Sequence, residues 1–421
     1  MEITNSKPPK GTIDLYGTDY DDMSKYKSTL EKLFVQNGGI GLETPVFEQR
    51  ENLMGKYGDE AETKLVFNLE TCGSEEAEKY TLRYDLTIPK VRFIQSKSID
   101  KARIYSIGKV YRRDNPSLGR YREFYQADFD IVGEDSSSLI NEMMLLKMAV
   151  QFVAQNNLGN PTILINHTEN LKHLLINLVK IPETKFKSVC SSIDKLDKMV
   201  FDDIVGELKS KGLDDAQIEI LKTHMSNPNP SNPETGCQID KLVRMSKPFG
   251  FDSNIKFTPW MARGLDYYNG MIWEIVLDGF KSTIISGGRY DGLVKGVSLV
   301  GISFGLSRIM DWVNQVLKKD QIKNQVQTNK LIWKPIYMLT TISNSIDLET
   351  KINVLAKLEL KFNTCIMTNS ELKEKKLVKT ITWCAQNYIK YLFVIAPDEL
   401  ALNKVILKDL ESQTQELVDL D

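Results

Sequence analysis

The chain has 421 residues, 42% of them hydrophobic, which is enough apolar material for two or three cores. Its 54 Lys and Arg residues nearly balance 56 Asp and Glu residues, giving a formal net charge of −2. This balance excludes a global field that would favour a nucleic-acid partner, so any polyanion site must be local. One local region runs from Lys90 to Glu123, where ten basic residues stand against three acidic ones, an excess of seven.

Cysteine and histidine usage argues against several kinds of site. The five cysteines are scattered without a Cys-x-x-Cys pair, so neither a zinc site nor a disulfide framework is indicated. His167, His173 and His224 lie outside glycine-rich or charged clusters, which argues against histidine-based nucleophilic catalysis. The amino terminus is polar and no apolar run approaches a membrane span. We therefore expect a cytoplasmic protein.

Residues 1–165 are predicted to mix strands with single helices. Apolar residues recur at helical spacing from Asp21 to Gln36, Gly38 and Gly39 close that segment, and a short strand should run from Ile40 toward Pro45. Further strands are expected at 80–86, 103–112 and 122–132, and a helix at 138–155. This order predicts an α+β domain built on an antiparallel sheet.

Residues 166–250 are lysine-rich and helical in pattern, with a turn-rich break at 227–233, and predict a helical insertion. Sheet signals resume in residues 251–325, with a strand at 271–277 and a helix at 305–316. The charged segment 318–330 is interpreted as a linker.

Residues 331–421 are predicted to form a small α/β domain, which is an ordinary size for an independent unit. Short β-rich runs are expected at 336–340, 364–367, 391–395 and 405–407. Helical stretches at 346–358 and 371–387 separate them.

Four arginines surround a Pro/Gly turn between two β-rich runs, in the segment from Tyr111 to Phe124: Arg112, Arg113, Arg120 and Arg122. A hairpin with a basic tip is predicted. Guanidinium groups bind phosphate oxygens in a bidentate way and keep their charge, so the loop suits a nucleoside triphosphate or a nucleic-acid end. A solvated turn is the equally good alternative for this loop taken alone.

Three glycine-containing segments follow: 262–270, 286–292 and 301–310. In the first, adjacent Tyr267 and Tyr268 would point to opposite faces of a regular strand, so that only a local bend brings both into one site. In the second, the Gly287-Gly288 pair permits a close backbone approach or a turn. The third predicts a strand passing into a helix that carries Arg308. None matches a Rossmann or P-loop pattern.

Taken in order, these segments resemble the motifs of class II aminoacyl-tRNA synthetases. The helix and strand ending near Pro45 resemble motif 1, the Arg112 loop motif 2 and the Arg308 segment motif 3. Within that class, residues 263–268 and 287–294 resemble the two signature peptides of histidyl-tRNA synthetases. Residues 81–87 and 126–133 resemble eukaryotic-type members. The likeness runs from Gly11 to the end of the chain, and several motifs in order weigh more than one match.

The resemblance implies a catalytic domain in two parts, 1–165 with motifs 1 and 2 and 251–325 with the signature peptides and motif 3. Residues 331–421 would form an anticodon-binding domain. It further implies activation of histidine with ATP, accompanied by Mg²⁺, to histidyl-adenylate, and transfer of histidine to the 3′ end of tRNA(His). A homodimer formed through motif 1 is also implied.

The resemblance assigns site residues by position. The catalytic set is Arg112, Arg263 and Arg308. ATP binding falls to Arg112, Asp114, Arg120 and Arg308. The residues that the resemblance assigns to histidine binding are Asp85, Leu86, Thr87, Arg112, Gln126, Asp130, Arg263, Tyr267, Tyr268 and Tyr290.

Two features depart from the family pattern. Ser307 stands where members usually carry an acidic residue just before the motif 3 arginine, and the motif 2 loop at 115–119 is short. The alternative function is a regulatory synthetase-like protein that binds histidine or tRNA without catalysis. Such proteins typically lose the arginine set, whereas Arg112, Arg263 and Arg308 are present here.

Overall fold

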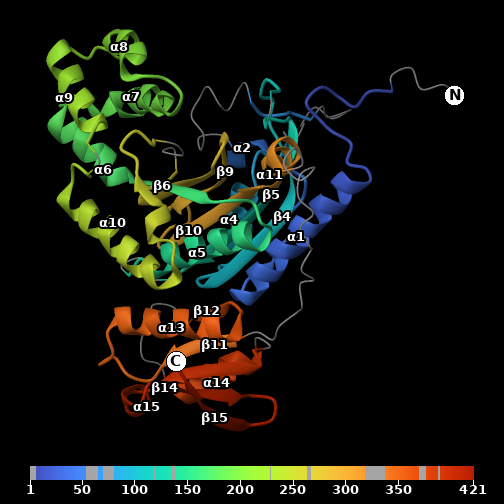
Figure 1. Ribbon diagram of the computed structural model, residues 1–421. Coiled ribbons are helices and arrows are strands. Elements are labelled where there is room, and N and C mark those ends of the chain that lie inside the picture. Colours follow the sequence, from blue (N-terminus) through green and yellow to red (C-terminus); the bar gives the residue numbers. More distant parts are fainter. Residues whose placement is uncertain are drawn as a thin grey trace.

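A computed structural model of the chain describes residues 6–53, 65–69, 80–117, 119–134, 138–227, 229–262, 267–317, 337–368, 376–386 and 389–421. Three regions can be followed in Figure 1: a central sheet with helices, a helical region at the upper left and a C-terminal domain below. The α+β class predicted from the sequence is confirmed. The linker expected at 318–330 lies outside the described residues.

The central sheet has eight strands in the described part of the chain, in the order β1-β4-β5-β10-β9-β8-β6-β7. Their bounds are β1 Ile40–Gly41, β4 Ala102–Tyr111, β5 Glu123–Val132, β10 Leu299–Gly305, β9 Phe280–Arg289, β8 Met271–Leu277, β6 Pro161–His167 and β7 Ile255–Phe257. Neighbours pair antiparallel from β4 through to β6, whereas β1 and β7 pair parallel at the two edges. The antiparallel sheet is therefore as predicted.

Alternation along the strands gives the sheet an apolar face and a polar one. On β5, Ala127, Phe129 and Ile131 are buried in a core that also includes residues of α1 (Thr18–Gln36), α5 (Ile140–Gln155) and α11 (Leu306–Trp312). Their neighbours Gln126, Asp128 and Asp130 point to the opposite face. There α4 (Thr87–Ser96) covers part of the sheet through Val91 and Ile94, whose core includes residues of β4 and β5.

The helical region between β6 and β7 has its own core, which runs from Leu171 to Met225 and includes Ala262. It comprises α6 (Thr168–Lys172), η1 (His173–Leu178), η2 (Glu183–Lys185), α7 (Phe186–Ile193), η3 (Asp194–Asp197), α8 (Phe201–Ser210) and α9 (Asp215–Met225). The next helix, α10 (Pro233–Ser246), instead packs with α5 in the main core. The helix α10, which lies within the insertion predicted at 166–250, thus belongs to the core of the central domain.

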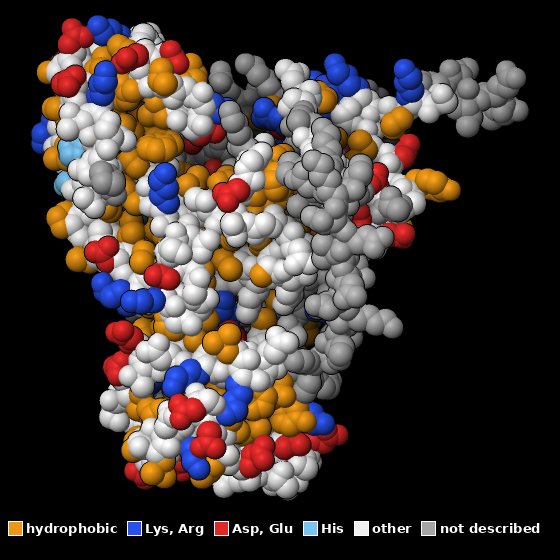
Figure 2. Space-filling view, viewed as in Figure 1, with side chains coloured by type: hydrophobic (Ala, Val, Ile, Leu, Met, Phe, Trp, Pro, Cys, Tyr) orange, Lys and Arg blue, Asp and Glu red, His pale blue; other side chains and the backbone are white. Residues whose placement is uncertain are grey.

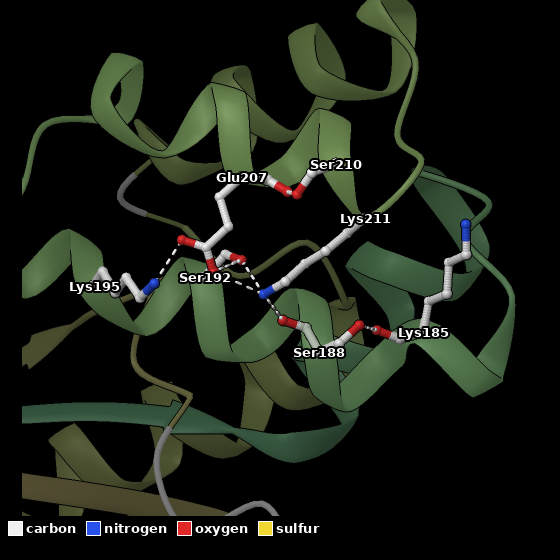
Figure 3. Close-up of polar contacts among 7 residues, drawn as sticks. All are labelled: Lys185, Ser188, Ser192, Lys195, Glu207, Ser210 and Lys211. Carbon is white, nitrogen blue, oxygen red and sulfur yellow. Dashed lines mark hydrogen bonds and ion pairs between the residues drawn. The ribbon is translucent and has the colours of Figure 1, made fainter.

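Glu207 of α8 ties the helices of this region together (Figure 3). Its carboxylate accepts hydrogen bonds from Lys195 Nζ at 2.5 Å, Lys211 Nζ at 2.9 Å and Ser192 Oγ at 2.9 Å. These donors lower the pKa of Glu207 to about 2. The cluster is partly exposed and holds α8 against α7 and η3.

The C-terminal domain is a five-stranded sheet in the order β12-β11-β13-β14-β15. Its strands are β11 Tyr337–Thr341, β12 Ile366–Thr368, β13 Tyr391–Ile395, β14 Lys404–Asp409 and β15 Thr414–Asp419, and its helices are α13 Leu348–Phe362, α14 Leu377–Gln386 and α15 Pro397–Ala401. The alternation of strands and helices predicted from the sequence is present, and the domain has β15 and α15 in addition. On the face shown in Figure 2, basic and acidic side chains are interspersed over this domain.

Buried polar contacts dock the C-terminal domain on the central domain. Lys147 of α5 pairs with Glu359 of α13 at 2.7 Å, with side chains only 2% and 8% exposed. Arg103, at the start of β4, donates to the Thr368 carbonyl at 3.3 Å. An unpaired buried charge is costly. Lys147 of the central domain and Glu359 of the C-terminal domain therefore each need the other to neutralise the buried interface.

Local boundaries differ from the sequence predictions in two places. The strand expected from Ile40 toward Pro45 is confined to Ile40–Gly41. The strand expected at 80–86 ends at Leu82, where β3 (Tyr80–Leu82) pairs with β2 (Phe47–Gln49), and α4 begins at Thr87. Asp85 favours the helical first turn, since its Oδ1 accepts a hydrogen bond from Ile88 N at 3.1 Å.

Candidate active site

A pocket on the polar face of the sheet brings together nearly all of the site residues predicted from the sequence. Those that line it are Asp85, Thr87, Arg112, Asp114, Arg120, Gln126, Asp130, Tyr267, Tyr268, Tyr290 and Arg308. Leu86 is buried and does not line the pocket. Arg263 lies outside the described residues. We call Asp85, Asp128 and Asp130 the acidic end of the pocket, and Arg112, Arg120 and Arg308 the arginine end.

Arg112 follows β4 and is held by aromatic neighbours. Its guanidinium carbon lies 4.2 Å from the ring centre of Tyr84 and 5.2 Å from that of Phe124, and its Nε donates to the Tyr84 carbonyl at 3.1 Å. Cation–π contact fixes the plane of the group without neutralising it. Arg120 pairs with Asp114 at 2.9 Å, with its side chain 54% exposed.

Arg308 links the helix α11 to the arginine loop at residues 112–122. Its Nε donates to the Gly119 carbonyl and its Nη1 to the Thr283 carbonyl, both at 2.9 Å. Gly119 has φ 72°, a left-handed conformation that favours glycine. Tyr121 adds a second link by donating its hydroxyl proton to Asp311 Oδ1 at 2.7 Å. The hairpin tip is thus docked on α11.

Ser307, which replaces the acidic residue usual in the family, has a structural partner here. Its Oγ accepts a hydrogen bond from Tyr125 N at 3.1 Å and so joins α11 to β5. The carboxylate that faces the loop comes instead from Asp311, one helical turn later. Burial raises the pKa of Asp311, and the Tyr121 hydroxyl acts in the opposite direction.

The acidic end contains a buried ion pair. Lys90 of α4 is 1% exposed and places its ammonium on Asp130 Oδ2, while the Tyr290 hydroxyl donates to Asp130 Oδ1. Across the sheet, Gly301 leaves room for this carboxylate, because a Cβ at that position would clash with Asp130. Asp130 is therefore compensated from within the chain.

Three tyrosines cluster beside this pair. The ring centres of Tyr267 and Tyr268 lie 4.3 Å apart, and those of Tyr267 and Tyr290 lie 6.0 Å apart. Burial is the largest cause of a raised pKa in each, so all three hydroxyls stay protonated at neutral pH. Both Tyr267 and Tyr268 line the pocket, because they precede β8 in a turn and not on a regular strand.

Sequence reasoning missed Lys90, Asp128 and Glu274. Asp128 and Glu274 line the pocket, and Asp128 could have been found from alternation with Gln126 and Asp130 along β5. Lys90 carries no such signal, because a lysine on a short helix is ordinarily solvated. Glu274 accepts a hydrogen bond from Thr283 Oγ1 at 2.8 Å.

An antiparallel sheet that carries an arginine hairpin, a strand-to-helix unit with Arg308 and an acidic subsite in one pocket has the organisation of a class II aminoacyl-tRNA synthetase. Comparison with known proteins narrows this class. The sequence profile of the family described as histidyl-tRNA synthetase matches residues 11–311. The chain belongs to that family.

Individual relatives agree with the family assignment. The chain is 32% identical to a cytoplasmic histidine–tRNA ligase of Oryza sativa subsp. japonica over 98% of its own length, but spans only 53% of that relative. It is 31% identical to a probable cytoplasmic histidine–tRNA ligase of Vairimorpha ceranae, over 99% of this chain and 98% of that one. The crystal structure of histidyl-tRNA synthetase from Nostoc sp. PCC 7120 shares the fold, with TM-score 0.59, 24% identity and coverage of 100% and 98%.

Proposed function

We propose that the protein is a histidine–tRNA ligase, which activates histidine with ATP and transfers it to tRNA(His). The observation that carries the proposal is the pocket, which joins an acidic end to an arginine end on one face of the sheet. A zwitterionic amino acid and a polyphosphate need this polarity, since the ammonium seeks carboxylates and the phosphates seek guanidinium groups.

In the proposed reaction, the histidine carboxylate attacks the α-phosphorus of ATP, forming the acyl-phosphate bond of histidyl-adenylate and expelling pyrophosphate. The chain would contribute positioning and charge stabilisation, not a nucleophile. Arg112, which Tyr84 and Phe124 hold in place, would contact the carboxylate and the α-phosphate. Arg308 and Arg120 lie on the side of the hairpin tip, where the outer phosphates would extend.

Mg²⁺ would accompany ATP and offset the charge of the triphosphate. The described residues contain no group of three or more His, Cys, Asp or Glu side chains that could hold a metal ion by themselves. A magnesium ion carried mainly by phosphate oxygens needs only one or two protein carboxylates. Glu274 fits this role, since it binds Thr283, the residue whose carbonyl anchors Arg308.

A homodimer formed through the motif 1 region is part of the proposal. The supporting observation is that α1, β1 and β2 each carry an exposed apolar side chain. Tyr20 is 60%, Ile40 61% and Phe47 50% exposed. Burying such side chains against a second copy would be favourable. Sedimentation should give a dimer mass, and a concentration-independent monomer with full activity would contradict it.

The C-terminal domain is proposed to contact the anticodon side of tRNA(His), in a cytoplasmic setting like that of the rice relative. Because Lys147 and Glu359 form a buried ion pair between the domains, deletion of the C-terminal domain would remove this contact and open a normally covered surface of the central domain to solvent. Its role is better tested in the full-length protein, by comparing tRNA charging with adenylate formation after substitutions on its exposed surface.

The decisive test is pyrophosphate exchange into ATP with each amino acid in turn, followed by charging of tRNA(His). Exchange that depends on histidine alone is expected. Folded protein that binds histidine without supporting exchange would favour the regulatory alternative. The presence of Arg112 and Arg308 in one pocket argues against that alternative.

Among the described residues, no helix is long and apolar enough to cross a membrane.

A further inference from the structure

One buried cation beside the pocket has no part in the reaction described above. Lys90 of α4 lies three residues after Thr87, which lines the pocket on the same face of the helix. Its side chain is 1% exposed, and its ammonium pairs with Asp130 Oδ2. Lys90 does not line the pocket, whereas Asp130 does. Any effect of Lys90 on a ligand must therefore pass through Asp130.

Asp130 can still accept a hydrogen bond from a ligand. Each carboxylate oxygen has two acceptor positions, of which Lys90 takes one on Oδ2 and the Tyr290 hydroxyl takes one on Oδ1. Gly301 on the neighbouring strand leaves the space that this carboxylate occupies. A ligand N–H can therefore bond to Asp130 while the ion pair stays intact.

The surroundings of Asp130 suit a flat ring. Three tyrosines lie beside it, with ring centres 4.3 Å apart for Tyr267 and Tyr268 and 6.3 Å apart for Tyr268 and Tyr290. Aromatic side chains pack favourably against other rings at such spacings. The imidazole is the part of histidine that is both flat and able to donate an N–H, so it is the group that fits at Asp130.

The ion pair leaves this ring subsite without net charge of its own. Lys90 and Asp130 cancel, and the three tyrosine hydroxyls stay protonated because burial raises their pKa. The residues opposite Asp130 on the adjacent strands are Ile104 and Gly301, which carry no charge.

Three further charged groups interact with this part of the pocket: Asp128 of β5, and Asp85 and Arg83 from the segment before α4. Burial raises the pKa of Asp128 to about 7, so this carboxyl adds little negative charge to the empty pocket below that pH. The charge at the ring subsite is therefore set mainly by the Lys90 and Asp130 pair.

This balance decides which form of an imidazole can bind. An imidazole changes its charge between pH 5 and 8. A lone buried carboxylate would attract the imidazolium, because a nearby opposite charge favours the ionised form. The Lys90 ammonium cancels that attraction, and burying a further positive charge beside the pair would be costly. The neutral ring, with one N–H donor and one acceptor nitrogen, needs no such compensation.

We propose that Lys90 is a positioning residue that holds Asp130 as a charge-compensated acceptor and so makes the pocket select the neutral imidazole of histidine over the imidazolium. The inference rests on the proposed function and adds a residue that the family resemblance does not assign. The same compensation works against amino acids with a cationic side chain of similar length, such as ornithine.

Calorimetry on the full-length protein tests this selection with two ligands, L-histidine and 3-(1,2,4-triazol-3-yl)-L-alanine. Both carry the same α-ammonium and α-carboxylate, but the triazole ring stays neutral between about pH 5.5 and about pH 8. The ratio of the two Kd values therefore cancels the titration of pocket groups that both ligands meet alike. In wild type, the ratio of the histidine Kd to the triazole Kd should rise about four- to tenfold from about pH 8 to about pH 5.5, as the imidazole becomes protonated in solution.

Substitutions at Lys90 test whether this residue sets the selection. Lys90→Met should hold the ratio within about twofold over the same pH range, because Asp130 without its cation also accepts the imidazolium. Lys90→Arg keeps the charge and should retain the wild-type pH dependence. Exposed Lys97→Met is the matched control. L-Ornithine should compete with histidine at least about tenfold better in Lys90→Met than in wild type.

ATP affinity shows whether each variant is folded. Where Lys90→Met is not folded, Lys90→Gln takes its place, since its amide can still donate to Asp130 without supplying a charge. The same loss of pH dependence is expected for Lys90→Gln.

A Kd ratio that stays flat with pH in wild type would mean that the imidazolium binds, and would overturn the inference. A wild-type pH dependence in Lys90→Met or Lys90→Gln would also overturn it, because Lys90 would then have a structural role alone. Both results leave histidine-dependent exchange intact. Wild-type protein that binds neither ligand and supports no exchange would instead defeat the proposed function.

Discussion

The two ends of the pocket hold charge in opposite ways. At the acidic end, Asp128 and Asp130 sit on a central strand, nearly inaccessible to solvent, and Lys90 compensates one of them from a helix. At the arginine end, Arg112 and Arg120 lie on the hairpin beside the sheet and remain partly accessible, anchored by carbonyls, rings and Asp114.

The difference follows from what each end would bind. A small amino acid is discriminated by buried polar groups that go unpaired with a wrong ligand, so rigidity and burial suit the acidic end. A triphosphate is large and highly charged, and long guanidinium side chains can reach it while staying solvated. Disturbing the acidic end should therefore affect folding as well as recognition, and disturbing the arginine end should affect mainly the reaction.

The largest expected effect is on the buried pair. Lys90→Met should lower the free energy of unfolding by about 3–5 kcal/mol, because it leaves Asp130 charged and unpaired. Denaturant titration measures this, with exposed Lys97→Met as control. The double variant Lys90→Met/Asp130→Asn should recover part of the loss. A double variant no more stable than the single one would show that the two residues are not coupled.

Asp128→Asn should change stability in the other direction. Because its folded pKa of about 7 lies above the ordinary aspartate value, the fold favours the neutral form. That contribution is present below about pH 4 and is lost as pH rises through 7. The variant should therefore match wild type at about pH 4 and below and exceed it at pH 8 by up to about 4 kcal/mol in the absence of ligand. If wild type and Asp128→Asn have the same free energy of unfolding at pH 8, the charge on Asp128 does not destabilise the fold.

Arg308→Ala tests the arginine end. In the proposed reaction Arg308 would stabilise phosphate charge, so its loss should reduce histidine-dependent pyrophosphate exchange by about 10² to 10³. Histidine affinity by calorimetry should stay within about twofold, since Arg308 contacts the hairpin and not the acidic end. Exposed Arg244→Ala serves as control. A comparable loss of histidine affinity would mean that the two ends are not separable.

The smallest effect concerns salt. Raising ionic strength from about 0.05 M to about 0.3 M should increase the KM for ATP several-fold, because solvent-accessible charges are screened over about a Debye length. The KM for histidine should change by less than about twofold, since Asp128, Asp130 and Lys90 are buried. Equal salt dependence for both substrates would contradict the contrast in exposure.

The sequence by itself determined the strands and helices whose periodicity is strong. Helix α1, the β4–β5 hairpin, β8 and β13 fall within a few residues of the predicted bounds, because apolar spacing along each of them matches the face that becomes buried. The start of α4 at Thr87, where Asp85 accepts a hydrogen bond from Ile88 N, did not show in that pattern.

For the pocket, the ordered motifs indicated which residues belong together, and all of those described except Leu86 line it. Only the tertiary structure decided how their charges are balanced. Lys90 meets Asp130 across 40 positions of the chain, while Oδ1 of the neighbouring Asp128 has no hydrogen-bond partner among the described residues. Pairing and burial of this kind depend on which elements are packed against each other, whereas a sequence motif specifies residue type and spacing.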